Sequence, residues 1–403
     1  MMIIERPDEV SRVEGTKKWM LVYGRRKTGK SFLVTNFIHY DDYFFVKTNK
    51  SIITNRNYTV SFDTFVELLK RSLDESKTVV VDEFQRLGPD FFDFLHSSKK
   101  QGRLILISST LYLSTKFFSS KSPLLGLLAE IPIGLIKIED ALRAISQFSL
   151  PKKERLEAAI LLSEPIVIDY FDETRPPRDL LANMLSSSMK TIPALIGEIF
   201  FEEERALSAI YEGILRGIAT GNVGSGELSS YLFSKKLTAK DDPSIIQQYL
   251  VNLVQVGILR RIEIFNKKRF IYKHTSPLSR IFYYADEKYN VSERKLLPAE
   301  IVPIIDEIMP KLVEDLVREA VARKHGLRES IVTASDHDVD ALLLKFKKPE
   351  IAIEVKWGII HAPDVKRSEE ILGRVEATRK ILFVPDKKGL KSTLEIWDVD
   401  DLA

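Results

Sequence analysis

The chain has 403 residues, of which 44% are hydrophobic and 29% are charged, and its formal net charge is +3. This length allows two or three domains that each bury a core. Disulfides, thiol catalysis and zinc–thiolate sites are excluded because there is no cysteine. The net charge is too small to imply a nucleic-acid partner by itself. The chain has no signal-peptide pattern and no apolar run of about twenty residues, so a cytoplasmic protein without a membrane partner is expected.

The first functional pattern is a glycine-rich loop between an apolar run and a helical segment. Trp19–Tyr23 predicts a β-strand and Phe32–Ile38 predicts a helix, and the loop between them has the Walker A spacing. In such a loop the backbone N–H groups hold phosphates, Lys30 reaches the β and γ phosphates, and the Ser31 hydroxyl ligates Mg²⁺. Binding of ATP or GTP with Mg²⁺ is therefore predicted. The expected nucleotide-binding residues are Gly24, Arg25, Arg26, Lys27, Thr28, Gly29, Lys30, Ser31 and Phe32.

A second apolar run, Thr78–Val81, ends in two carboxylates, as in a Walker B strand. Asp82 is predicted to hold Mg²⁺ through water, and Glu83 is predicted to polarise the attacking water. A strand that ends in Asp-Glu can also be an ordinary solvated strand end, but the nearby Walker A loop favours the catalytic interpretation. A third run, Leu104–Ile107, leads to Ser109, which is predicted to sense the γ phosphate. The acidic residue beside the metal ligand argues for hydrolysis as well as binding.

Hydrophobic periodicity divides the chain into four parts. Residues 1–138 alternate strands with amphipathic stretches, which predicts a parallel α/β sheet and a P-loop ATPase core. Residues 139–201 have helical periodicity over Lys152–Leu162 and Arg178–Phe200, which predicts a helical lid.

Residues 202–290 have the pattern of a winged helix-turn-helix. The basic tip of the expected hairpin and the amides of Gln247, Gln248 and Asn252 favour contact with DNA. The expected recognition helix has no Lys or Arg, so packing against the nucleotide domain is the alternative. The predicted elements are helices Glu203–Thr220, Glu227–Phe233 and Asp242–Gln255, followed by a hairpin of Ile258–Phe265 and Phe270–His274.

Residues 291–403 carry a second set of acidic residues that predicts an α/β nuclease-like domain. Because side chains alternate along a strand, Glu354 and Lys356 share one face, and a hairpin brings Asp340 to the same edge. Two carboxylates and a lysine in this arrangement can bind Mg²⁺ and activate a water beside a phosphodiester. Glu314, on the preceding helix, is a further predicted metal ligand. An inactive nuclease-like fold and a plain surface hairpin are the alternatives.

Together these residues resemble the archaeal ATPase family, a branch of the AAA+ and STAND-like P-loop proteins, in the form with a C-terminal domain of restriction-endonuclease type. The resemblance implies Mg²⁺ and ATP as ligands and a nucleic-acid partner, with DNA expected, for the terminal domain. The motifs that carry it are Tyr23–Ser31, Asp82–Gln85, Leu104–Thr110, Ser119–Leu124, Asp242–Ser244 with Tyr249-Leu250, Glu314, His337–Asp340 and Glu354–Trp357.

Three positions depart from the family pattern. Leu125-Gly126-Leu127 contains no Arg where the family usually has Gly-Arg, which implies slow hydrolysis or a different arginine. Ser108 stands where Gly is common, and Asp338 where Glu is usual. The working hypothesis is an ATPase whose nucleotide state gates a DNA-processing domain. The alternative is a STAND-like nucleotide switch with slow hydrolysis, in which an inactive nuclease-like scaffold binds partners or DNA. A homo-oligomer is compatible with either hypothesis.

Overall fold

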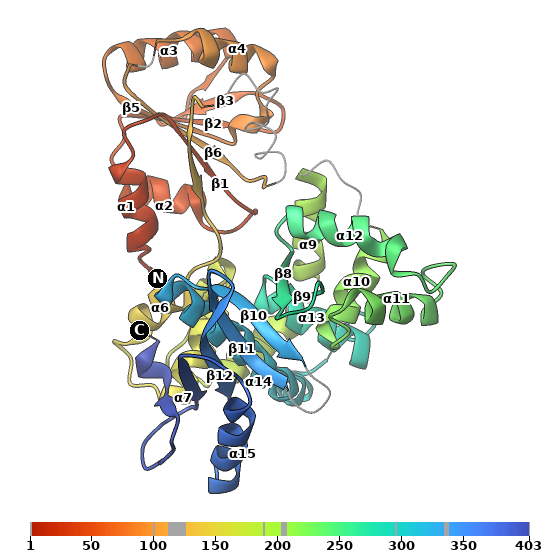
Figure 1. Ribbon diagram of the computed structural model, residues 1–403. Coiled ribbons are helices and arrows are strands. Elements are labelled where there is room, and N and C mark those ends of the chain that lie inside the picture. The colour runs from red at the N-terminus through yellow and green to blue at the C-terminus, as the bar shows by residue number, and fades with distance from the viewer. Residues whose placement is uncertain are drawn as a thin grey trace. The chain divides into compact units, whose positions relative to one another are not determined.

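The computed structural model describes residues 2–99, 101–111, 126–187, 190–202, 208–294, 296–333 and 338–402. The chain falls into two compact units (Figure 1). The N-terminal unit consists of Arg6–Leu135 and Gly197–Ala206, and the C-terminal unit consists of Met1–Glu5, Ile136–Ile196 and Leu207–Ala403. The predicted motif residues Ser119–Leu124 and His337 lie outside the described residues. In the part of the chain that the structure describes, no helix has the length and apolarity to cross a bilayer.

The N-terminal unit is built on a seven-stranded sheet with the order β4-β3-β2-β5-β6-β1-β7. The strands from β2 to β7 in this order are parallel, while β3 and β4 extend the edge in antiparallel pairing. The strands are β1 (Met20–Tyr23), β2 (Asp42–Val46), β3 (Ile52–Thr54), β4 (Thr59–Val60), β5 (Thr78–Asp82), β6 (Arg103–Ser108) and β7 (Ala129–Pro132). The predicted parallel α/β sheet is confirmed.

Helices cover both faces of this sheet (Figure 1). Val79 and Val81 of β5 pack in the same core as residues of α3 (Phe62–Asp74) and α4 (Pro89–Ser97). Val80 points to the opposite core, which α1 (Pro7–Gly15) and α2 (Lys30–Phe37) cover. A parallel sheet buried on both faces explains why its strands are continuous apolar runs.

The C-terminal unit begins with helices. The helix predicted over Lys152–Leu162 is α7, and the one predicted over Arg178–Phe200 is two helices, α8 and α9. Ser186 and Ser187 end α8, which fits the low helix propensity of serine. The elements are α6 (Ile138–Ile145), α7 (Lys152–Leu162), the short 3₁₀ helix η2 (Pro165–Tyr170), α8 (Pro177–Ser187) and α9 (Thr191–Glu202). The division into two units falls within α9, after Ile196.

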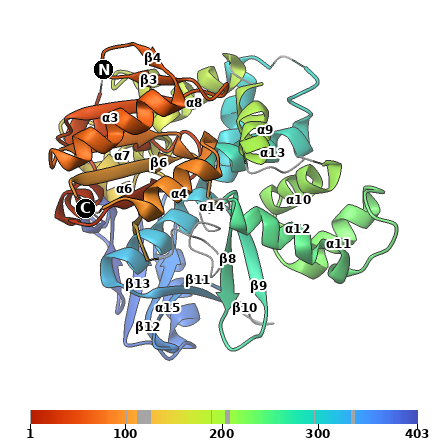
Figure 2. The ribbon, with the colours of Figure 1, turned by 90° about the horizontal axis from the view of Figure 1, so that it is seen from above.

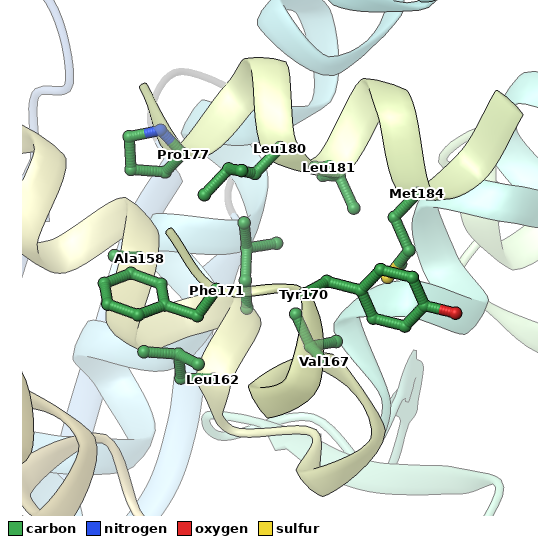
Figure 3. Close-up of a pocket in the computed structure, with 10 residues that line it drawn as sticks. Ala158, Leu162, Val167, Tyr170, Phe171, Pro177, Leu180, Leu181 and Met184 are labelled. Carbon is green, nitrogen blue, oxygen red and sulfur yellow. The ribbon is translucent and has the colours of Figure 1, made fainter. Parts of the chain in front are cut away.

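Helices α7, η2 and α8 enclose a small apolar cavity (Figure 3). Its volume of about 10 Å³ is that of a single water molecule, and its lining includes Leu162, Tyr170, Phe171 and Met184. A space of this size is a packing gap in the core rather than a ligand site.

The predicted winged-helix elements are present and end within a few residues of their predicted bounds. The Asp242 carboxylate caps α12 by accepting a hydrogen bond from the Ser244 backbone N–H. Residues 203–207 of the first expected helix lie outside the described residues. The elements are α10 (Ala209–Ala219), α11 (Ser225–Ser234), α12 (Pro243–Gln255), β8 (Leu259–Ile264), β9 (Phe270–His274) and α13 (Pro277–Tyr289).

The winged hairpin and the terminal residues share one sheet, with the order β14-β13-β12-β11-β10-β8-β9. Strand β8 pairs in parallel with β10, and the two views place them side by side (Figure 2). The predicted boundary at residue 290 therefore separates two parts of a continuous sheet. The remaining elements are α14 (Pro298–His325), β10 (Arg328–Thr333), β11 (Asp338–Lys345), β12 (Lys348–Val355), α15 (Ala362–Gly373), β13 (Arg379–Phe383), β14 (Glu395–Trp397) and the short 3₁₀ helix η3 (Val399–Asp401).

Candidate functional site

The glycine-rich loop connects β1 to α2, as the sequence predicts. A Cβ atom at Gly24 would lie 2.0 Å from the carbonyl oxygen of Ile133, so only glycine fits there. Gly29 precedes the first residue of α2 with a φ of 82°, a left-handed conformation that glycine adopts without strain. Each of these two positions in the Walker pattern thus requires glycine for a different steric reason. Together the two glycines let the loop lead directly into the N-terminus of α2, where backbone N–H groups attract phosphate.

Lys30 lies buried under this loop. Its Nζ atom donates to the carbonyl oxygen of Arg25 at 2.8 Å and lies 3.5 Å from Oγ1 of Thr28. The Thr28 hydroxyl donates to the same Arg25 carbonyl at 2.9 Å. These contacts fix the ammonium group within the curve of the loop, where phosphates are expected to bind.

Other predicted loop residues differ in exposure. Lys27 is exposed, the ring of Phe32 is partly exposed, and Arg25 is buried. The Arg26 guanidinium forms an ion pair with Glu198 at 2.9 Å, and this part of α9 belongs to the N-terminal unit. The structure therefore gives Arg26 a protein partner that the sequence did not predict.

Arg6 braces the loop from outside and was missed by the sequence analysis. Its guanidinium donates to the carbonyl oxygens of Thr28 at 2.8 Å and of Gly134 at 3.1 Å. The side chain is almost fully buried and also forms an ion pair with Glu9. No local pattern links Arg6 to a loop more than twenty residues away, so only the fold reveals this contact.

The predicted magnesium ligands Ser31 and Asp82 lie together. They share a side-chain hydrogen bond, and the Tyr43 hydroxyl donates to Oδ2 of Asp82 at 2.8 Å. Burial raises the pKa of the Asp82 carboxyl, while the hydrogen bonds from Ser31 and Tyr43 lower it. The other oxygen, Oδ1, is buried and has no hydrogen-bond partner. A carboxylate oxygen left unsatisfied beside a serine hydroxyl fits a magnesium ion, directly or through its waters.

Glu83 follows directly and has a left-handed backbone, with a φ of 59°. This conformation is uncommon for a residue with a side chain and is concentrated at functional sites. Its Oε2 atom accepts hydrogen bonds from Ser109 at 2.9 Å and from Gln85 at 2.8 Å, and it pairs with Arg86 at 2.9 Å. Ser109 reaches Glu83 because β6 lies next to β5 in the sheet. The structure thus brings together the predicted general base and the predicted γ-phosphate sensor.

A comparison with family models identifies this region. Residues 16–128 match the model of the AAA domain. They form an AAA-type P-loop ATPase domain. The match confirms the expected class of ATPase, with ATP and Mg²⁺ as its ligands, and it does not extend to the C-terminal unit.

Several solved structures are similar to the chain. One is a Walker-type ATPase of Pyrococcus abyssi, at 17% identity over 70% of this chain and 96% of that chain, with a TM-score of 0.48. Another is the ORC2 protein of Aeropyrum pernix in ADPNP–ADP complexes, at 14% identity over 75% and 93% of the two chains, with a TM-score of 0.41. The ORC1 protein of the same organism in complex with DNA has 13% identity over 72% and 95%, with a TM-score of 0.29. No curated protein matches the chain.

The second group of predicted site residues lies at one end of the β11–β12 hairpin in the C-terminal unit. Oδ2 of Asp340 accepts a hydrogen bond from the Val355 backbone N–H at 2.9 Å, which ties it to the end of β12. Nζ of Lys356 pairs with Oε1 of Glu354 at 2.6 Å. Glu314 approaches from α14. We call Glu314, Asp340, Glu354 and Lys356 the carboxylate cluster.

Burial and mutual repulsion act on the carboxylate cluster. Burial, followed by the charge of Asp340, raises the pKa of Glu314 to about 7 against the opposing effect of Lys311. The same two causes raise the pKa of Glu354, and Lys356 opposes them. Oε2 of Glu354 is buried without a hydrogen-bond partner. Within the described ranges, however, no three acidic or histidine side chains are arranged to hold a metal ion.

Three residues that the sequence analysis missed hold the cluster in place. Lys311 pairs with Glu314 at 2.8 Å, and the guanidinium of Arg318 donates to the backbone carbonyl of Asp340 at 3.2 Å. Glu157 of α7 accepts a hydrogen bond at 3.0 Å from the Trp357 indole, next to Lys356. The first two project from α14 one turn before and after Glu314, so the helix pattern could have identified them.

The winged helix leaves fewer groups for DNA than its sequence predicted. Asn252 donates to the Tyr211 hydroxyl at 2.6 Å and accepts from Gln248 at 2.9 Å. Arg260 forms ion pairs with Glu319 and Glu329. Because these groups have structural contacts, base reading by Asn252 would require breaking two hydrogen bonds.

Proposed function

We propose that this protein is a Mg²⁺-dependent ATPase whose nucleotide cycle controls DNA binding and DNA cleavage by the C-terminal unit. The observation that carries the proposal is the carboxylate cluster. It places Asp340, Glu354 and Lys356 at one strand end, with the partly buried carboxyl of Glu314 beside them. Carboxylates that lie close together and have raised pKa values as a result are typical of catalytic sites.

For ATP hydrolysis, each role falls on a residue in the N-terminal unit. Lys30 would neutralise charge on the β and γ phosphates, and Ser31 with Asp82 would hold Mg²⁺. Glu83 would accept the proton of the attacking water, and its hydrogen bond from Ser109 fixes the position of the carboxylate. The magnesium ion would supply charge neutralisation in the transition state.

For DNA cleavage, Asp340 and Glu354 would hold a divalent cation, and Glu314 would have to move closer to become a third ligand, because the three carboxylates are not arranged around a metal site in this structure. Oε2 of Glu354, which has no hydrogen-bond partner in the described part of the chain, would hold the cation, whose charge would weaken the ion pair between Oε1 and Lys356. Lys356 would then be free to orient the attacking water beside the phosphodiester. The cation would polarise the phosphate and lower the pKa of that water. In this scheme the contacts of Lys311 and Lys356 offset part of the carboxylate charge until the metal binds.

Helix α9 supports the proposed coupling. Its C-terminal part belongs to the N-terminal unit, where Glu198 pairs with Arg26 of the phosphate-binding loop, and its first residues belong to the C-terminal unit. A phosphate bound to the loop would compete with Glu198 for the guanidinium of Arg26. ATP that bound more tightly to one arrangement of α9 would shift the population toward it.

A DNA-cleavage assay tests the cleavage part of the proposal. Wild-type protein, Asp340→Ala and Glu354→Gln are incubated with plasmid, linear and single-stranded DNA in Mg²⁺ or Mn²⁺. The matched control is Glu370→Gln, because Glu370 is an exposed acid of the same unit. We expect metal-dependent cleavage by wild type and the control, and a loss of about 100-fold or more in both cluster variants. Equal cleavage by all four proteins would overturn the assignment, and no cleavage by any would leave the C-terminal unit a binding scaffold.

A further inference from the structure

The β11–β12 hairpin ends in an unusual turn at the end opposite the carboxylate cluster. Its tip, Lys345-Phe346-Lys347-Lys348, is a two-residue turn in which Phe346 has a φ of 48° and Lys347 a φ of 72°. Such turns favour Asn-Gly, since residues with larger side chains are strained at positive φ. The Phe346 side chain is also 93% exposed. The fold therefore holds an aromatic ring in water on a strained backbone.

The charges of the hairpin tip are a second unfavourable feature, beside the strained backbone. Lys345 and Lys348 lie directly opposite each other in the strand register, and Lys347 is adjacent. Like charges in directly opposed positions destabilise a strand pair. Among the described residues none of these three lysines forms an ion pair, and all three are exposed. Exposed lysines alone would keep the turn soluble. Solubility therefore does not explain why an exposed aromatic ring lies among them.

We propose that the hairpin tip is a nucleic-acid contact in which Phe346 stacks on a base and the three lysines contact phosphates. A bound polyanion would reduce the repulsion between the lysines, and an unpaired base would cover the exposed ring. Proteins commonly bind single strands through base–aromatic stacking and basic side chains. The proposal rests on the proposed function for its choice of partner, because the same hairpin carries Asp340 and Glu354 at its other end. An anionic membrane surface would satisfy the same charges but would gain nothing from that connection.

The hairpin also predicts where the contact falls. Phe346 lies six positions after Asp340, which at about 3.3 Å per residue is about 20 Å. A nucleic-acid strand in helical form rises about 3.4 Å per nucleotide, so the stacked base lies about six nucleotides from the cleaved phosphate. The tip thus fixes the strand at a set distance from the carboxylate cluster.

Binding of the full-length protein to fluorescein-labelled single-stranded and duplex oligonucleotides tests this proposal. Fluorescence anisotropy is measured at several salt concentrations with Ca²⁺ in place of Mg²⁺ to suppress cleavage. Phe346→Asn removes the ring and suits the left-handed turn, so the variant keeps its fold. Phe346→Trp keeps an aromatic ring at this position, so this variant should bind as wild type does. The control is Tyr58→Asn, since Tyr58 is 67% exposed in the turn of the β3–β4 hairpin.

We expect Phe346→Asn to weaken single-strand affinity by about 5- to 150-fold with an unchanged salt slope. The double variant Lys345→Gln/Lys348→Gln should lower the salt slope by about 1.4, from about 0.7 per phosphate contact on a single strand. The charge control, Lys388→Gln/Lys391→Gln, removes two exposed lysines elsewhere in the same unit and should bind as wild type does.

The outcomes separate this proposal from the cleavage proposal. Weakened DNA binding by Phe346→Asn supports the tip contact even if no metal produces cleavage. Wild-type affinity in both tip variants overturns it even if Asp340→Ala abolishes cleavage. Loss of binding to phosphatidylserine vesicles by Phe346→Asn, with DNA binding unchanged, would also overturn it in favour of a membrane contact.

Discussion

The nucleotide site and the carboxylate cluster both gather buried or partly buried charges at strand ends, but they hold them differently. Backbone geometry fixes the nucleotide site: Gly24 fits under a carbonyl, and Glu83 has a left-handed conformation. The carboxylate cluster depends on side-chain ion pairs, in which Lys356 holds Glu354 and Lys311 holds Glu314. The first arrangement is preorganised for phosphate, whereas the second would have to weaken its lysine contacts in order to bind a cation.

The largest expected effect tests the preorganised site. Glu83→Gln keeps the side-chain volume but cannot accept a proton, so kcat for ATP should fall by about 10²- to 10⁴-fold while ATP still binds. Multiple-turnover phosphate release and binding of a fluorescent ATP analogue measure the two quantities. Glu67→Gln, at an exposed position of α3, is the control. Unchanged turnover in Glu83→Gln would move the role of general base to another residue.

A smaller effect is expected for the phosphate counter-charge. Lys30→Ala removes a charged hydrogen-bond donor, which corresponds to a loss of about 10- to 150-fold in ATP affinity. Lys27→Ala is the matched control, because Lys27 lies on the same loop with an exposed side chain. Isothermal titration calorimetry distinguishes them. Tight ATP binding by Lys30→Ala would contradict the Walker A assignment.

Gly24→Ala tests whether the backbone defines the nucleotide site. The new Cβ would overlap the Ile133 carbonyl oxygen, so we expect a loss of about 1–3 kcal/mol in the unfolding free energy of the N-terminal unit. Gly88→Ala is the control, because nothing lies within 4 Å of a Cβ at that position. Urea denaturation measures both, and equal stability in the two variants would show that the loop yields to the methyl group.

The pH dependence of stability tests the carboxylate cluster. Because the folded pKa of Glu314 is about 7, above its ordinary value of 4.5, the folded state holds a proton that the unfolded state releases. The contribution is complete below pH 4.5 and is lost as the pH rises through 7, by at most about 1.4 kcal/mol per pH unit. Urea denaturation without divalent cations should show this decline in wild type and in Glu370→Gln. An identical decline in Glu314→Gln would contradict the assignment to Glu314.

Sequence alone predicted the parts of both sites that follow from local patterns. The Walker loop, the Asp82-Glu83 strand end and helix α7 were predicted because glycine spacing and hydrophobic periodicity are local. Arg6 and Tyr43 were missed, since their contacts join segments far apart in the chain. The shared sheet was missed for the same reason: the pairing of β8 with β10 spans more than sixty residues. Glu314 was predicted from its helix face, but its lysine partner was not.

The most direct test of the account is the DNA-cleavage rate of wild type and Lys30→Ala, each with and without ATP, in the metal that supports cleavage. We expect ATP to change the rate of wild type and to leave that of Lys30→Ala unaltered, because the variant has lost the phosphate contact. Equal rates in all four reactions would contradict control of the carboxylate cluster by the nucleotide site.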